Sequence, residues 1–120
     1  MSKRILIVDD EPNIRKLLSV RLKNSKYGVV EAADGKEALE KVKDEKPDLI
    51  ILDVMMPVMD GYEFLKRLKK NRENSKIPII MLTARYGMEG LFSALDINAF
   101  VPKPFKADKI LSTIKSLLKE

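Results

Sequence analysis

The sequence contains no cysteine and no histidine. Without cysteine, the chain cannot form disulfides, perform thiolate chemistry or bind a metal through sulfur. Without histidine, it lacks the commonest general base and the commonest zinc ligand. Any reaction of this chain must therefore use carboxylates, hydroxyls, lysines, backbone amides or a bound cofactor.

Long apolar runs are also missing. No segment reaches membrane-spanning length, and the amino terminus lacks the features of a signal peptide. We therefore expect a cytoplasmic protein that does not contact a membrane. The net charge is +5, from 23 basic and 18 acidic residues, and the basic residues are scattered among acidic ones. Because this distribution is typical of a solvated surface, we expect no direct binding of nucleic acid.

The 120 residues are enough for one domain with its own core. Five β-rich apolar segments alternate with five helical patterns, which predicts an α/β fold with a parallel sheet, helices on both faces and right-handed crossovers. The expected strands are residues 4–8, 29–32, 49–52, 77–82 and 99–101. No repeat or linker interrupts the pattern, so we expect a single domain over residues 1–120 without an output domain.

Local signals place the expected helices. In the first helix, Ile14, Leu17, Leu18 and Leu22 recur at helical spacing, and Tyr62, Leu65 and Leu68 form the apolar side of the third. Capping boxes are expected at Asp34–Glu37 and Asp60–Glu63. Lys106 leaves the last helix poorly capped. The 85–98 segment contains Gly87 and Gly90, which predict a short or frayed helix.

Polar residues follow four of the expected strands. Asp9 and Asp10 follow the first strand, Asp53 the third, Thr83 the fourth and Lys103 the fifth. Because the carboxyl ends of parallel strands lie on one edge of a sheet, these side chains should meet in one shallow pocket. The structural alternative is that Asp53 bonds a turn amide and that one of Asp9 and Asp10 caps the first helix. Capping does not account for both adjacent acids.

Three carboxylates need compensating charge, because two unit charges about 4 Å apart repel by ~4 kcal/mol at an effective dielectric constant near 20. Lys103 can neutralise one of them, and Mg²⁺ suits the others. A carboxylate beside Mg²⁺ can attack phosphorus to give an acyl phosphate. Mg²⁺ and lysine would then spread the phosphoryl charge, and the Thr83 hydroxyl could bond a phosphoryl oxygen.

Four motifs in this order identify a resemblance that covers the whole chain. They are Ile7–Asp10, Leu52–Gly61, Leu82–Ala84 and Lys103–Phe105. The sequence resembles the receiver domains of two-component response regulators, in the single-domain form found in chemotaxis. The resemblance implies a three-layer, flavodoxin-like, doubly wound sheet with strand order 2-1-3-4-5 and five helices.

The resemblance also implies roles for the acids. Asp53 would be the phosphoacceptor, with Mg²⁺ or Mn²⁺ as the cofactor. Asp10 would bind the metal directly, Asp9 mainly through water, and Met55 through its backbone carbonyl. Bulky residues at Met55 and Arg85 would slow hydrolysis of the acyl phosphate.

The remaining roles concern signalling. Thr83 would be the switch hydroxyl, Lys103 the phosphoryl-contacting lysine and Phe100 the aromatic switch, and the Lys103–Pro104 bond would be cis. The partners would be a sensor histidine kinase or phosphotransfer protein and a downstream protein target. Ile14 and Leu18 are candidates for kinase docking, although core packing suits Leu18 better.

The segment from Thr83 to Lys103 looks shorter than is usual in the family, and Asn98-Ala99 replaces the family's Gly-Ala. These departures concern the fourth helix and its partner-binding face and leave the catalytic residues intact. Two other functions remain open. A pseudo-receiver would act only as an interaction module, although the intact acids, threonine and lysine argue against it. A phosphatase with an aspartyl nucleophile would need a second acid and a lid, for which the chain is short.

Overall fold

One parallel sheet organises the protein. The computed structural model describes residues 3–53, 61–83 and 97–119. The sheet has the order β2-β1-β3-β4-β5, so β1 and β3 lie beside each other in its interior. The strands are β1 (Arg4–Val8), β2 (Gly28–Ala32), β3 (Leu49–Asp53), β4 (Ile79–Thr83) and β5 (Ala99–Pro102). The predicted sheet and its strand order are confirmed.

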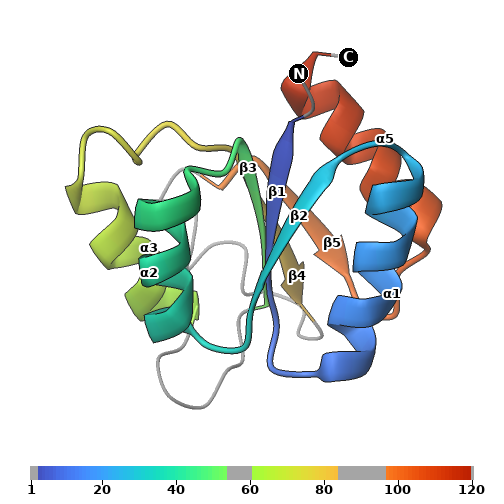
Figure 1. Ribbon diagram of the computed structural model, residues 1–120, viewed down its shortest axis with the longest axis horizontal. Helices are drawn as coiled ribbons and strands as arrows, with labels where there is room; N and C mark the ends of the chain where they lie inside the picture. Colours follow the sequence, from blue (N-terminus) through green and yellow to red (C-terminus); the bar gives the residue numbers. More distant parts are fainter. Residues whose placement is uncertain (1–2, 54–60, 84–96, 120) are drawn as a thin grey trace.

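Helices cover both faces of this sheet (Figure 1). The pair α1 (Pro12–Asn24) and α5 (Ala107–Leu118) lies on one face, and the pair α2 (Gly35–Glu45) and α3 (Gly61–Lys70) lies on the other. This arrangement confirms the predicted three layers. The described residues contain four helices, and the expected helix at 85–98 falls almost wholly outside them.

The alternation of side chains along each strand divides the core in two. Ile5 and Ile7 of β1 belong to the cluster beneath α1 and α5, whereas Leu6 and Val8 belong to the cluster beneath α2 and α3. All five residues of β3 are buried. A strand covered on both faces needs apolar residues at consecutive positions, which explains the unbroken apolar run before Asp53.

The helix ends largely follow their sequence signals. Asp34 Oδ1 accepts a hydrogen bond from the Glu37 amide at 2.8 Å, and Glu37 Oε1 accepts one from the Ala33 amide at 3.0 Å. The cap predicted at Asp34 is therefore confirmed. Lys106 makes no side-chain cap, also as predicted. The second expected capping box begins at Asp60, outside the described residues.

Some expectations about the helix faces were wrong. Leu17 is 49% exposed, whereas Leu18 and Leu22 are the buried leucines of α1. Tyr62 is 37% exposed, and the fully buried aromatic residue of α3 is Phe64. In addition, β4 begins at Ile79 and not at Ile77.

None of the helices that the structure describes combines the length and the apolar character that crossing a membrane requires.

Candidate functional site

The carboxyl ends of the strands bring the predicted polar residues together. Asp9 directly follows β1, Asp53 is the last residue of β3, and Lys103 directly follows β5. Thr83 is the last residue of β4, and its backbone is in register with Pro102, the residue before Lys103. Four strands therefore deliver their terminal residues to one edge of the sheet, as the sequence predicted.

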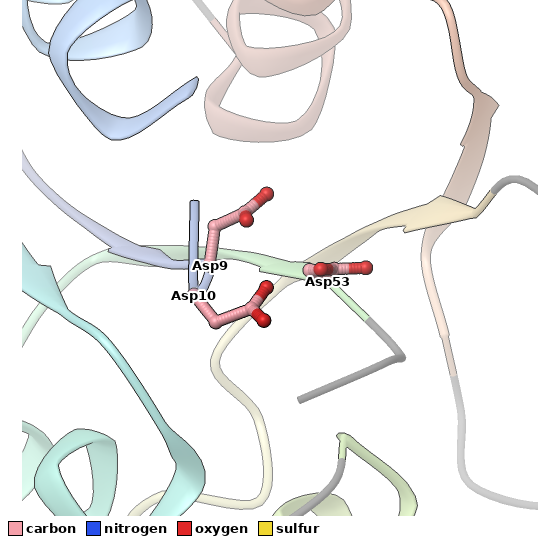
Figure 2. A group of neighbouring side chains, drawn as sticks. All are labelled: Asp9, Asp10 and Asp53. Carbon is pink, nitrogen blue, oxygen red and sulfur yellow. The ribbon is translucent and has the colours of Figure 1, made fainter. Parts of the chain in front are cut away.

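Three carboxylates gather at this edge. Asp9, Asp10 and Asp53 each offer an oxygen, and these oxygens all lie within 4.8 Å of one another. Figure 2 shows Asp9 and Asp10 extending from the end of β1 toward the end of β3, where Asp53 lies. Asp9 is fully buried and Asp53 is 5% exposed, whereas Asp10 is exposed. The pocket therefore has a desolvated floor and an open side.

Asp9 uses its two oxygens differently. Its Oδ1 accepts a hydrogen bond from the Glu11 amide at 2.9 Å, just before helix α1. Its Oδ2 lies 3.3 Å from Lys103 Nζ. One oxygen of Asp9 thus bonds an amide at the start of α1, near where the capping alternative would place it, and the other faces Lys103 in the pocket.

Lys103 supplies positive charge to the acids. Its Nζ lies 3.3 Å from Asp9 Oδ2, 3.5 Å from Asp53 Oδ2 and 3.6 Å from Glu11 Oε1. Its side chain is 17% exposed. One ammonium group therefore faces three carboxylates, of which Asp9 and Asp53 are shielded from water.

This crowding shifts two pKa values. Burial raises the pKa of Asp9, and it outweighs the Glu11 amide and the Lys103 ammonium, which both favour the ionised form. Burial lowers the pKa of Lys103, but the charges of Asp53 and Asp9 outweigh burial, so the pKa of Lys103 is raised overall. The lysine therefore stays protonated at neutral pH, and the ionised form of Asp9 is costly.

The donor set suits a hard divalent cation. Two ionised carboxylate oxygens within 4.8 Å of each other repel by at least about 3.5 kcal/mol at an effective dielectric constant near 20. Lys103 forms ion pairs with Asp9 and Asp53, whereas none is seen for Asp10 among the described residues. Mg²⁺ takes oxygen ligands and commonly uses one or two carboxylates with water and substrate oxygens. Asp9, Asp10 and Asp53 provide such oxygens on the open side of a buried floor.

Other expected site residues have mixed outcomes. Met55 and Arg85 lie outside the described residues, and of Thr83 only the backbone is described. Phe100 is in register with Met81 and packs against the cluster beneath α2 and α3. The Lys103–Pro104 peptide bond is cis, in agreement with the prediction.

The sequence did not assign two residues that the structure places at the site. Glu11 is the third carboxylate facing Lys103. Arg15 donates a hydrogen bond from Nη1 to the Asp9 backbone carbonyl at 2.6 Å. Glu11 could have been suspected because it continues the acidic run after β1. Arg15 lies in an ordinary helical pattern, and only the packing of α1 on the sheet brings it to Asp9.

An apolar groove adjoins the pocket. It has a volume of about 410 Å³ and is lined by Glu11, Ile14, Leu17, Lys103, Pro104 and Phe105. Glu11 and Lys103 belong to both the groove and the acidic pocket. A molecule in this groove would therefore contact Lys103, whose ammonium group faces Asp9, Asp53 and Glu11.

Comparison with known proteins points to one family. The family model described as "Response regulator receiver domain" matches residues 5–115. The alkaline phosphatase synthesis transcriptional regulatory protein PhoP of Bacillus subtilis is 42% identical over 99% of this chain and 50% of its own length. The chain thus spans about half the length of the curated relatives it matches.

Solved structures give the same result for the fold. The chemotaxis response regulator CheY4 of Vibrio cholerae superposes with a TM-score of 0.91 at 36% identity, covering 98% of this chain and 99% of that one. The receiver domain of a sensor histidine kinase from Pseudomonas aeruginosa PAO1 gives a TM-score of 0.90 at 26% identity, with both chains fully covered. That structure has a magnesium ion coordinated in its active site cleft.

Proposed function

Because the chain belongs to the family of response regulator receiver domains, we propose that it is a cytoplasmic phosphoacceptor switch of a two-component system. Asp53 accepts a phosphoryl group from the phosphohistidine of a histidine kinase or phosphotransfer protein, or from a small acyl phosphate. The observation that carries this proposal is the convergence of Asp9, Asp10 and Asp53 around one open pocket that also holds the Lys103 ammonium.

The proposed cofactor is Mg²⁺, or Mn²⁺ in its place. Asp9, Asp10 and Asp53 would hold it, together with the backbone carbonyl of Met55. When bound, it would neutralise charge on the phosphoryl oxygens. The ion in the Pseudomonas aeruginosa receiver domain supports this assignment. The burial of Asp9 supports it too, because a desolvated carboxylate is stabilised by a nearby cation.

The chain's own residues perform the transfer. A carboxylate oxygen of Asp53 attacks phosphorus, a P–O bond forms, and the P–N bond to the donor imidazole breaks with its electron pair returning to nitrogen. Lys103 Nζ already lies 3.5 Å from Asp53 Oδ2, so it can contact the oxygens of the arriving group. The receiver therefore assists its own phosphorylation without turning over a substrate as an enzyme does.

The phosphoryl donor docks over the apolar groove beside the pocket. Continuity supports this assignment, since Glu11 and Lys103 line both cavities. Ile14 and Leu17 provide the apolar contact. Leu18 is 1% exposed, so its role is core packing. The groove would align a donor histidine with Asp53.

Phosphorylation is read through Thr83 and Phe100. The Thr83 hydroxyl bonds a phosphoryl oxygen, and the Phe100 ring repacks in response. The position of Phe100 at the margin of the core supports this role, because its ring can move without opening the fully buried strands. A downstream protein then distinguishes the two states. The bulky residues Met55 and Arg85 give the acyl phosphate a long lifetime.

The test is incubation with acetyl phosphate and Mg²⁺ followed by intact mass measurement. We expect one phosphoryl adduct on the wild-type chain and none on Asp53→Asn, which keeps the size of the side chain. An adduct of equal amount on Asp53→Asn would show that the acceptor is wrong. No adduct on the wild type would favour an interaction module, and turnover without an adduct would favour an aspartyl-nucleophile phosphatase.

A further inference from the structure

Arg15 links three secondary-structure elements beside the acidic pocket. It lies in α1, its Nη1 donates to the Asp9 carbonyl at 2.6 Å, and its Nε donates to Glu31 Oε1 at 3.3 Å. Glu31 belongs to β2, and Asp9 follows β1. The Arg15 side chain is 19% exposed, so its guanidinium lies largely within the protein. Its contact with the site is through the main chain of Asp9.

The carbonyl that Arg15 holds belongs to the peptide between Asp9 and Asp10. A peptide unit is planar, so holding its oxygen also sets the direction in which the chain enters Asp10. The other side of Asp9 is already fixed, because its amide donates to the Ala32 carbonyl at 3.1 Å and continues the pairing of β1 with β2. Arg15 therefore controls the orientation of one specific peptide at the point where the strand becomes a turn.

Asp10 depends on that peptide more than the other two acids do. Asp9 is held by the Glu11 amide and Lys103, and Asp53 pairs with Lys103. Among the residues that the structure describes, none is seen to hydrogen-bond or ion-pair with the exposed Asp10 carboxylate. Its direction toward Asp9 and Asp53 is thus set by its backbone. A carboxylate on a less restrained peptide would spend less time aimed at the pocket.

Glu31 gives Arg15 its own orientation. Its carboxylate is 42% exposed and lies on the edge strand, in register with Ile7 of β1. Such a half-exposed ion pair contributes little to stability by itself. The ion pair does orient the planar guanidinium between the end of β1 and helix α1. A lysine has no planar group with fixed donors, so it could contact the same oxygens only as a point charge.

We propose that Arg15, oriented by Glu31, is a positioning residue that aims the Asp10 carboxylate at the divalent-cation site through the Asp9–Asp10 peptide. The proposal rests on the proposed function in that it requires the three acids to bind the ion. Hydrogen bonds that orient ligand groups commonly change metal affinity by about 10- to 100-fold. Because Arg15 acts on one ligand of three, we expect a change near the lower end of that range.

The experiment measures binding of Mn²⁺ alone, by the loss of the free-ion paramagnetic resonance signal, with no phosphoryl donor present. Arg15→Met keeps the apolar stem of the side chain and removes its donors, so we expect about 10-fold weaker binding. Arg15→Lys should recover part of that loss. The matched control is Arg21→Met, since Arg21 lies on the same helix and pairs with Asp108 of α5, away from the pocket.

A double-mutant cycle separates positioning from general loosening of the fold. If Arg15 acts through Asp10, Arg15→Met should add little to the loss caused by Asp10→Asn, yet it should still weaken binding about 10-fold in an Asp53→Asn background. Equal losses in all three backgrounds would overturn the proposal, as would binding in Arg15→Met equal to that of the wild type.

A missing metal site and a mistaken role for Arg15 would give different results. A wild-type chain that binds no Mn²⁺ would overturn the metal site itself, and the role of Arg15 with it. A wild-type chain that binds Mn²⁺ while Arg15→Met and Arg21→Met show the same affinity would overturn only the role of Arg15. Thermal unfolding of each variant accompanies the titrations. If Arg21→Met loses as much stability as Arg15→Met and also loses as much affinity for Mn²⁺, the result counts against a positioning role for Arg15.

Discussion

Replacing Lys103 with methionine removes the ammonium group from the acidic pocket while retaining an unbranched stem. At an effective dielectric constant near 20, the 3.3 Å contact with Asp9 and the 3.5 Å contact with Asp53 are each worth about 5 kcal/mol of gross attraction. The cost of desolvating the lysine offsets most of this. Removing one member of a buried pair typically costs 3–5 kcal/mol, and since Lys103 is 17% exposed we expect about 3 kcal/mol.

The pH dependence identifies the cause of this loss. The pKa of Asp9 is raised in the folded state, so the folded chain binds more protons than the unfolded chain, and wild-type stability falls as the pH rises through that pKa. Lys103→Met should raise this pKa further. Its destabilisation should therefore be larger at pH 7 than at pH 4, because acid protonates Asp9 and removes a charge that Lys103 compensates. Because the pKa of Lys103 is raised, the stabilisation that this ammonium group gives the wild type is lost only in alkaline solution, at a pH above the ordinary pKa of lysine.

The assay is urea unfolding followed by circular dichroism, at pH 7 and pH 4, in EDTA and with Mg²⁺. In EDTA at pH 7 we expect a loss of about 3 kcal/mol, or about 10 °C in the melting temperature. Mg²⁺ at about 100 times its Kd should restore about 2.7 kcal/mol, because the variant retains the metal ligands. Lys109→Met, at an exposed position of α5, is the control. An equal loss at both pH values would refute the electrostatic argument.

Three further predictions test other parts of the structure. Asp9→Asn should stabilise the metal-free protein at pH 7 by about 1 kcal/mol, because it removes a buried charge, and it should abolish stabilisation by Mg²⁺. Urea unfolding that shows a less stable metal-free variant would contradict this. Leu17→Glu should slow transfer from a phosphohistidine protein at least severalfold without changing the rate with acetyl phosphate, and equal rates from both donors would remove the groove from the docking surface. Asp34→Ala should cost about 1 kcal/mol of stability through loss of the α2 cap without altering phosphorylation, and unchanged thermal unfolding would contradict the cap.

The helices show where sequence patterns stop being sufficient. Leu17 and Leu18 both fit a helical apolar stripe, but only the packing of α1 on the sheet decides that Leu18 is buried and Leu17 is exposed. Likewise, Phe64 is buried on α3 while Tyr62 lies at its margin. The helical period predicts which side of a helix is apolar, and the surface against which the helix packs decides which residues on that side are buried.

The sequence by itself determined the parallel sheet and the meeting of Asp9, Asp10, Asp53 and Lys103, and its resemblance to receiver domains implied the strand order. A continuous apolar run requires a strand covered on both faces, and parallel strands place their carboxyl ends on one edge. Only the tertiary structure decided that Lys103 pairs with Glu11 as well, and that Arg15 holds the Asp9 carbonyl. Those contacts depend on the distance between α1 and the ends of β1 and β5. Packing sets this distance, and no periodic pattern in the sequence predicts it.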